Sequence, residues 1–159
     1  MSVTVRAARP ADAALVVRFI GDLAAYERLT HEAEASEADI VRALFGAAPR
    51  VFCQIAELDG EPAGFALWYY TFSTFQGRHG IWLEDLFVAP ALRGRGIGKA
   101  LLGDLARRCV DEALGRLEWT VLDWNRPSID FYLSRGAVFM DDWRRCRVSG
   151  AALVSLGAP

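Results

Sequence analysis

The sequence has few of the residues that build metal centres and disulfide frameworks. Its 159 residues include only three cysteines and two histidines, which lie far apart along the chain. An odd number of separated cysteines argues against a disulfide framework and against a cysteine-type zinc site. We therefore expect no metal ion, and we expect the reducing cytoplasm as the compartment.

Excess positive charge and long apolar runs are also missing. The formal net charge is −2, whereas nucleic-acid binding depends on many cationic contacts to phosphates. No apolar run is long enough to cross a membrane, and no basic segment followed by an apolar stretch marks a signal peptide. We therefore expect neither a nucleic-acid nor a membrane partner. Lys99 is the only lysine, and the abundance of Ala, Arg and Gly favours a GC-rich bacterial genome.

The residues that are present predict one α/β domain over residues 1–159. Hydrophobic residues make up 53% of the chain, which is enough for a substantial core. Apolar periodicity and turn signals predict strands and helices in a mixed order, which is typical of one sheet covered by helices. The expected strands cover 3–7, 51–58, 62–72, 80–88, 117–123, 138–148 and 151–156, and the expected helices cover 10–29, 36–44, 97–110 and 127–135.

A glycine-rich stretch, "RGRGIGK" at 93–99, lies between an expected strand and an expected helix. It is not a dinucleotide-binding fingerprint, because Lys99 stands where the third glycine should be, and it lacks the spacing of a Walker A loop. The remaining pattern, Arg-x-x-Gly-x-Gly, directs several backbone N–H groups at the positive end of a helix, where a diphosphate can bind. Alternatively, the glycines serve only a tight turn.

Three stretches in the same order decide between these readings by resemblance: "LAAYERL" at 23–29, "WLEDLFVAPALRGRGIGKALL" at 82–102 and "VLDWNRPSIDFYLSRGA" at 121–137. Together they resemble the GNAT superfamily of N-acetyltransferases, and within it the spermidine/spermine (diamine) and thialysine acetyltransferases. The likeness spans nearly the whole chain. It implies a mixed central sheet with a splayed strand pair, flanked by about four helices.

The resemblance implies acetyl-CoA as cosubstrate. Its diphosphate would bind the loop, at Arg93, Gly94, Arg95, Gly96, Ile97, Gly98 and Lys99. Its pantetheine arm would pair with the backbone of a bulged strand at Leu86, Phe87 and Val88, and Asn125 and Ser128 would contact the pantetheine and phosphate portions.

Two residues are candidates for catalysis. Glu84 is an acidic residue in an otherwise apolar strand, and the resemblance implies that it accepts a proton from the amine, directly or through water. Asp85 would support it from behind. The resemblance also implies that Tyr132 is the general acid for the leaving thiolate. Without the resemblance, the two carboxylates could cap the strand or pair with arginines, and Tyr132 could be a half-buried core residue.

The acceptor site is implied at Tyr26 and Glu27, which with Glu84 would form an acidic pocket with an aromatic edge, suited to a cationic amine. The loop at 70–82 departs from the polyamine enzymes, because it carries Arg78 and His79. Arg78 would repel a long polycation or bind a carboxylate, and the second option suits an amino-acid-like amine.

The sequence therefore predicts an N-acetyltransferase that acts on a small primary amine by direct transfer in a ternary complex. The cysteines lack an evident histidine base, so a covalent acetyl-enzyme is not expected. A protein or peptide acetyltransferase and a non-catalytic acyl-CoA sensor stay open as alternatives. The resemblance also implies a homodimer.

Overall fold

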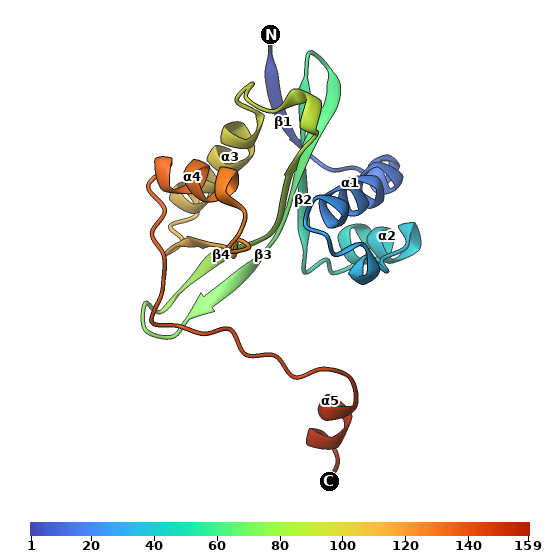
Figure 1. Ribbon diagram of the computed structural model, residues 1–159, viewed down its shortest axis with the longest axis vertical. Helices are drawn as coiled ribbons and strands as arrows, with labels where there is room; N and C mark the ends of the chain where they lie inside the picture. The colour runs from blue at the N-terminus through green and yellow to red at the C-terminus, as the bar shows by residue number, and fades with distance from the viewer. The chain divides into compact units, whose positions relative to one another are not determined.

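The computed structural model describes all 159 residues and divides them into two compact units, Met1–Thr120 and Val121–Pro159. The single domain expected over residues 1–159 stays a prediction. The expected α/β class, with a mixed sheet and helices, is confirmed (Figure 1). No helix is long and apolar enough to cross a membrane.

The first unit is built on a five-stranded sheet in the order β1-β2-β3-β4-β5. The first four strands, β1 (Val3–Ala7), β2 (Phe52–Leu58), β3 (Glu61–Ser73) and β4 (Arg78–Val88), pair antiparallel, whereas β5 (Leu117–Glu118) is parallel to β4. Asp59 and Gly60 both have positive φ in the turn between β2 and β3, as a two-residue hairpin requires. An Asp-Gly pair between two expected strands is a strong sequence signal for such a hairpin.

Two helices, α1 (Ala13–Tyr26) and α2 (Glu37–Phe45), cover one face of the sheet, and α3 (Ile97–Asp111) covers the other (Figure 1). The expected first helix, 10–29, ends earlier, because Arg28 takes a positive φ. The core under α1 and α2 includes side chains from three strands, β2, β3 and β4. It contains Ala13, Val16, Phe19, Ile40, Leu44, Cys53, Ile55, Phe65, Leu67 and Phe87.

The face of the sheet under α3 is tied to that helix by an aromatic and charged network. The Tyr70 hydroxyl donates to Glu112 (2.6 Å), and the Arg108 guanidinium lies 5.1 Å from the centre of the Trp68 ring. Trp68 and Tyr70 therefore mark the α3 face. Leu67, which belongs to the core under α1 and α2, marks the opposite face.

The predicted strands at 138–148 and 151–156 are wrong. In the second unit, α4 (Arg126–Ser134) is followed by a stretch without regular structure and then by a helix, α5 (Gly150–Leu156). A strand needs a neighbour for its backbone hydrogen bonds, and the 138–148 stretch has none. Alanine and leucine at 151–156 favour a helix. The strand predicted at 117–123 is shortened to Leu117–Glu118.

Candidate active site

A β-bulge in β4 decides where the acidic residues point. Along the β3–β4 ladder Leu83 faces Trp68 and Asp85 faces Leu67, so Glu84 is the extra residue that no β3 residue opposes. Residues paired across a ladder lie on the same face of the sheet. Leu83 therefore lies on the α3 face with Trp68, whereas Asp85 lies on the α1 face with Leu67. The bulge reverses the in-and-out phase of the strand at this point.

Glu84 also turns toward the α1 face. Its carboxylate accepts a hydrogen bond from the Trp82 indole N–H (2.9 Å), and Trp82 pairs with Tyr69, two residues from Leu67 on the same face. The period-two alternation of a regular strand would put Glu84 and Asp85 on opposite faces of the sheet. The bulge instead brings both carboxylates to one side.

A third carboxylate, Glu27, comes from the end of α1. Burial raises the pKa of Glu27. Burial, together with the charges of Glu84 and Glu27, raises the pKa of Asp85 from its usual 3.8 to about 7. The carboxylates of Glu84 and Glu27 are therefore close enough to Asp85 to repel its charge, and a cation placed among the three would relieve that repulsion. No group of three or more His, Cys, Asp or Glu is arranged to hold a metal ion.

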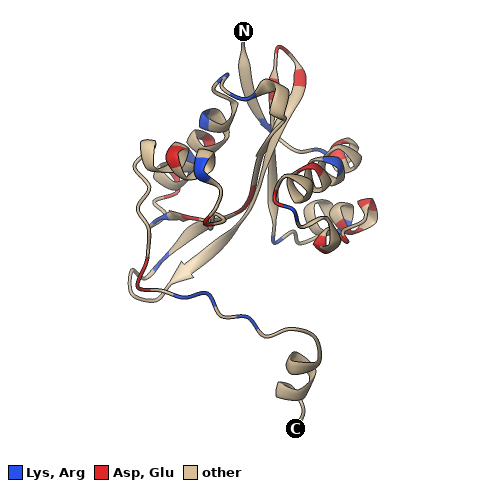
Figure 2. Cartoon of the chain, in the orientation of Figure 1, with Lys and Arg blue, Asp and Glu red and all other residues tan.

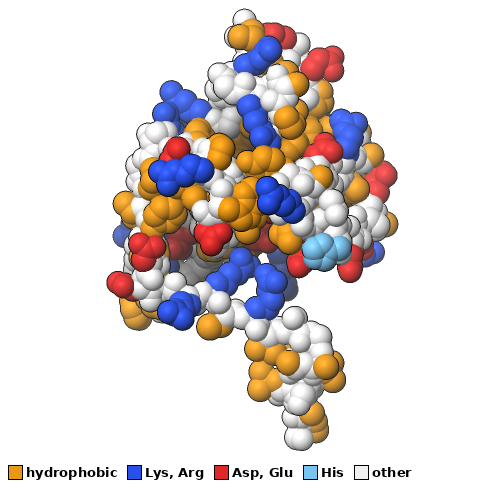
Figure 3. All heavy atoms as spheres, viewed as in Figure 1, with side chains coloured by type: hydrophobic (Ala, Val, Ile, Leu, Met, Phe, Trp, Pro, Cys, Tyr) orange, Lys and Arg blue, Asp and Glu red, His pale blue; other side chains and the backbone are white.

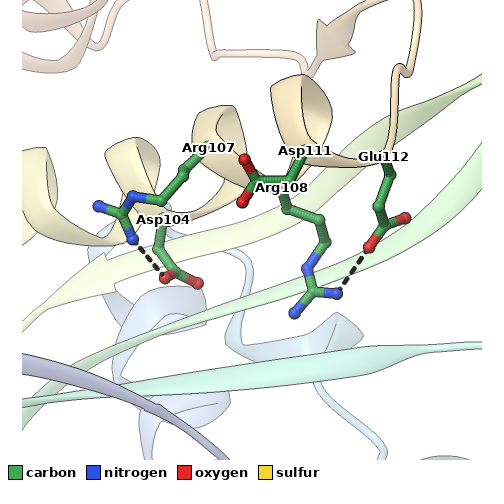
Figure 4. Close-up of a pocket in the computed structure, with 5 residues that line it drawn as sticks. All are labelled: Asp104, Arg107, Arg108, Asp111 and Glu112. Carbon is green, nitrogen blue, oxygen red and sulfur yellow. Dashed lines mark hydrogen bonds and ion pairs between the residues drawn. The ribbon is translucent and has the colours of Figure 1, made fainter.

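Charged residues are spread over the helices and strands of the first unit (Figure 2), and several of them form ion pairs. On α3 a shallow hollow is lined by Asp104, Arg107, Arg108, Asp111 and Glu112 (Figure 4). Arg107 pairs with Asp104 (3.3 Å) and Arg108 with Glu112 (2.9 Å). These charges largely cancel, so the hollow lacks the negative potential of the Glu27–Glu84–Asp85 group.

The glycine loop has the geometry of an anion cradle. Gly94 and Gly96 have φ of 76° and 83°, a region that side chains rarely adopt, and Gly96 caps the 15-residue helix α3. Nothing lies within 4 Å of a Cβ built on either glycine, so the backbone is open to a ligand. Ile97 is buried and anchors the first turn, whereas Lys99 is exposed. Arg95 contacts the Met1 sulfur (3.6 Å).

Arg93, implied as a ligand of the diphosphate, makes two contacts through its side chain. Its guanidinium lies 4.5 Å from the centre of the Tyr26 ring, and its Nε donates to the Val88 carbonyl (3.2 Å). The side chain therefore contacts the end of α1 and of β4, whereas the glycines that follow form the cradle.

The outer edge of β4 is open where the pantetheine arm was expected. The ladder with β5 contains only two pairs, Ile81–Leu117 and Trp82–Glu118. Beyond Trp82, the outer edge of β4 has no neighbouring strand. Leu86, Phe87 and Val88, the residues expected to pair with pantetheine, lie in this part of the strand. The Phe87 side chain is buried in the core, so only its backbone is available to a ligand.

In the second unit, α4 carries the other predicted residues. Asn125 is the N-cap of α4, and its side-chain oxygen accepts the Ser128 N–H (3.4 Å). This hydrogen bond gives Asn125 a structural role that the sequence analysis did not assign to it. Tyr132 is half-buried, and its ring lies 5.4 Å from that of Phe131.

The Arg78 side chain, expected either to repel a long polycation or to bind a carboxylate, lies at the start of β4, near the turn before β5. A Cβ on Gly115 would lie 3.0 Å from the Arg78 side chain, so Arg78 packs beside the turn before β5. It stands six residues before Glu84 in the same strand, which corresponds to roughly 20 Å. The His79 ring contacts the Thr71 carbonyl (2.9 Å).

The cysteines offer no nucleophile in the first unit. Burial, with the charges of Asp12 and Asp85, raises the pKa of the Cys53 thiol to about 12. Burial also raises the pKa of Cys109. A thiol that stays protonated is a poor nucleophile, which favours direct transfer over a covalent acetyl-enzyme.

A bulged acidic strand, a neighbouring strand that soon leaves it, and a glycine cradle at the head of a helix are together the features of an N-acyltransferase. Residues 18–137 match the acetyltransferase (GNAT) family, and the chain belongs to that family. It is therefore an acetyltransferase, as the sequence predicted.

Several of its relatives fall within the predicted group. A thialysine N-epsilon-acetyltransferase from Bos taurus is 34% identical over 97% of this chain and 96% of its own length. A human spermidine/spermine N(1)-acetyltransferase-like protein 1 is 31% identical over 96% of this chain, which corresponds to 23% of that protein. Among solved structures, an integron cassette protein from the mobile metagenome of V. cholerae has a TM-score of 0.82 and 28% identity, covering 100% of this chain and 99% of that one.

Asp85→Asn should stabilise the protein at alkaline pH. Because the folded protein holds the Asp85 proton up to about pH 7 and the unfolded chain releases it near 3.8, wild-type stability falls as pH rises through that window. The asparagine variant avoids this loss. We expect its free energy of unfolding in urea to exceed that of the wild type by on the order of 1–3 kcal/mol at pH 8, and by less at pH 4.

Asp22→Asn, at an exposed position of α1, serves as the matched control and should show no such pH-dependent gain. Equal stability of Asp85→Asn and the wild type at pH 8 would show that Asp85 is an ordinary surface carboxylate.

Proposed function

We propose that this chain transfers the acetyl group of acetyl-CoA to a primary amine of a small cationic or amino-acid-like acceptor, directly and in a ternary complex. The observation that carries the proposal is the grouping of Glu27, Glu84 and Asp85 on one face of the sheet, imposed by the bulge at Glu84. Three unneutralised carboxylates attract an alkylammonium ion and disfavour an anion.

The same carboxylates would remove the proton that blocks the amine. An alkylammonium has a pKa near ~10.4 and no lone pair until it loses a proton. A carboxylate of ordinary pKa lies about six units below the ammonium, whereas Asp85 lies only about three units below it. We assign proton acceptance to the Glu84–Asp85 pair. Glu84 is the exposed member that meets the amine, and Asp85 is the more basic member behind it.

The remaining parts of the reaction would require a site for the cosubstrate and a proton donor. The freed amine nitrogen attacks the thioester carbonyl carbon, a C–N bond forms, the C–S bond breaks, and the thiolate takes a proton. The cradle at 94–99 would bind the diphosphate through backbone N–H groups, and the edge of β4 at 86–88 would pair with pantetheine. Tyr132 is our candidate for the donor of the last proton.

The proposed acceptor is an amine that carries a second positive charge. The acidic group does not determine whether the rest of the acceptor is a polyamine or an amino acid. One relative is named for thialysine, a lysine-like amino acid, and the other for spermidine and spermine. Because Arg78 packs away from the acidic group, it offers no reason for this chain to prefer a carboxylate-bearing amine. The acidic group itself suits both classes.

A coenzyme A-release screen tests the proposal. Wild-type enzyme is given acetyl-CoA with diamines, polyamines, thialysine, lysine or a lysine-containing peptide, and we expect turnover with small dicationic amines. Glu84→Gln should lower kcat/KM by about 10²-fold or more at neutral pH and by less as pH rises, because free amine becomes available. Tyr132→Phe should lower kcat with little change in acetyl-CoA affinity.

Arg78→Ala is the matched control for charge and should leave the ratio between thialysine and spermidine unchanged. Turnover confined to the peptide would favour a protein acetyltransferase, and acetyl-CoA binding without turnover on any amine would favour a sensor. Either result would overturn the proposal.

We also propose that the protein is a homodimer. Residues 138–156 expose several large apolar side chains, with Trp143 74% and Met140 60% exposed, and apolar surface is visible on α5 at the lower end of Figure 3. Contiguous exposed apolar surface is a mark of an interface. Light scattering of the full chain at micromolar concentration should give twice the mass of the 17.5 kDa chain, and a monomer would contradict the proposal.

A further inference from the structure

Arg93 stands at the boundary between two parts of the first unit. It is the last residue before the glycine cradle, since Gly94 immediately takes a positive φ. Its own backbone is extended, and its N–H donates to the Pro90 carbonyl (3.3 Å). The residue is therefore fixed by a short 3₁₀ turn on one side and borders the cradle on the other.

The side chain of Arg93 is directed at the acceptor side of this boundary. Its guanidinium carbon lies 4.5 Å from the centre of the Tyr26 ring and 6.0 Å from that of Phe87, and its Nε donates to the Val88 carbonyl. A planar cation over an aromatic face is an attractive contact. The hydrogen bond to Val88 fixes the direction of the guanidinium plane.

Tyr26 is the last residue of α1, and the next residue is Glu27, whose charge acts on Asp85. Glu27 lies at the C-cap, and Arg28 then takes a positive φ that ends the helix. Backbone hydrogen bonds from Glu27 to Leu23 (2.9 Å) and from Leu29 to Ala24 (2.8 Å) close the end of α1, and the contact with Arg93 ties this end to the loop after β4. A contact that holds Tyr26 also holds Glu27 opposite the bulge in β4.

We infer that Arg93 is a positioning residue of the acceptor pocket, holding Tyr26 and Glu27 against the carboxylates of β4, and is not a ligand of the acetyl-CoA diphosphate. This inference rests on the proposed function for the meaning of the pocket. The diphosphate is left to the backbone of the cradle and to the neighbouring cations Arg95 and Lys99.

One consequence is coupling between the two ligands. The cradle and the end of α1 share Arg93, so a ligand that orders the cradle also favours the pocket, and the effect is reciprocal. The acceptor amine should therefore bind more tightly when coenzyme A is present than when it is absent, and removing the Arg93 side chain should abolish that difference.

The test compares two substitutions of Arg93 with one of Arg95. Arg93→Ala removes both contacts, Arg93→Gln keeps a planar donor for Val88 but removes the cation, and Arg95→Ala removes a charge from the same loop. For Arg93→Ala we expect acceptor KM to rise about tenfold and the Kd of coenzyme A to change by less than about threefold. Arg93→Gln should lie between Arg93→Ala and the wild type. Arg95→Ala should weaken the binding of coenzyme A, and at saturating acetyl-CoA its acceptor KM should equal that of the wild type.

A second readout does not depend on turnover. Amide hydrogen exchange in residues 23–27 should become about tenfold faster in Arg93→Ala, because the end of α1 loses its contact, and should be unchanged in Arg95→Ala. If the wild type shows no transfer, the proposed function fails, while coenzyme A affinity and exchange still decide the role of Arg93. A tenfold loss of coenzyme A affinity with unchanged exchange in residues 23–27 would make Arg93 a diphosphate ligand and overturn the inference, as would no change in any of these quantities.

Discussion

The extra residue in β4 is the constraint on which the rest of the site depends. Without the bulge at Glu84, the strand would alternate regularly, and the two adjacent carboxylates would lie on opposite faces of the sheet. With it, Leu83 packs under α3, Phe87 packs under α1, and Glu84 and Asp85 lie together on the α1 face. A change of register by one residue thus brings two adjacent carboxylates to the same face of the sheet.

That arrangement is costly in the absence of a ligand, and the neighbouring structure makes it tolerable. Burial and mutual repulsion raise the pKa of Asp85 to about 7, so the group sheds part of its charge by holding a proton. Several other charged residues of the first unit form ion pairs. Arg6, for example, donates to Asp12 and Glu57 and links β1 and β2 to the start of α1. The carboxylates of Glu27, Glu84 and Asp85 differ from these ion pairs, because they lie near one another and repel.

Much of the framework could be predicted from local sequence. The Asp59–Gly60 turn, the cap at Ser36 and the cradle ahead of α3 each depend on a few neighbouring residues, and the structure has all three. The bulge could not be predicted, because register is set by pairing with β3 and not by β4 alone. The predicted strand at 138–148 failed for a related reason, since its apolar pattern has no partner in the chain.

Two side chains that the motifs assign to the cosubstrate, Arg93 and Asn125, make contacts within the protein as well. Arg93 fits the pattern of an anion-binding loop, yet Tyr26, 67 positions earlier in the sequence, holds its guanidinium. Asn125, which stays a candidate for contact with the cosubstrate, is also the N-cap of α4, and an asparagine followed by Arg-Pro at the start of a helix is typical of an N-cap. Long-range contacts needed the structure, whereas the cap could have been found from the sequence.

The central claim is that the bulge builds a group of mutually repelling carboxylates that a cationic amine neutralises. Carbon-detected NMR titration of the Asp85 side-chain carboxyl tests it most directly, with and without a saturating diamine. We predict an apparent pKa near 7 in the free protein and a lower value with the diamine bound, because a neighbouring positive charge favours the ionised form. An Asp85 pKa near 4 in the free protein, unchanged by the diamine, would contradict the account.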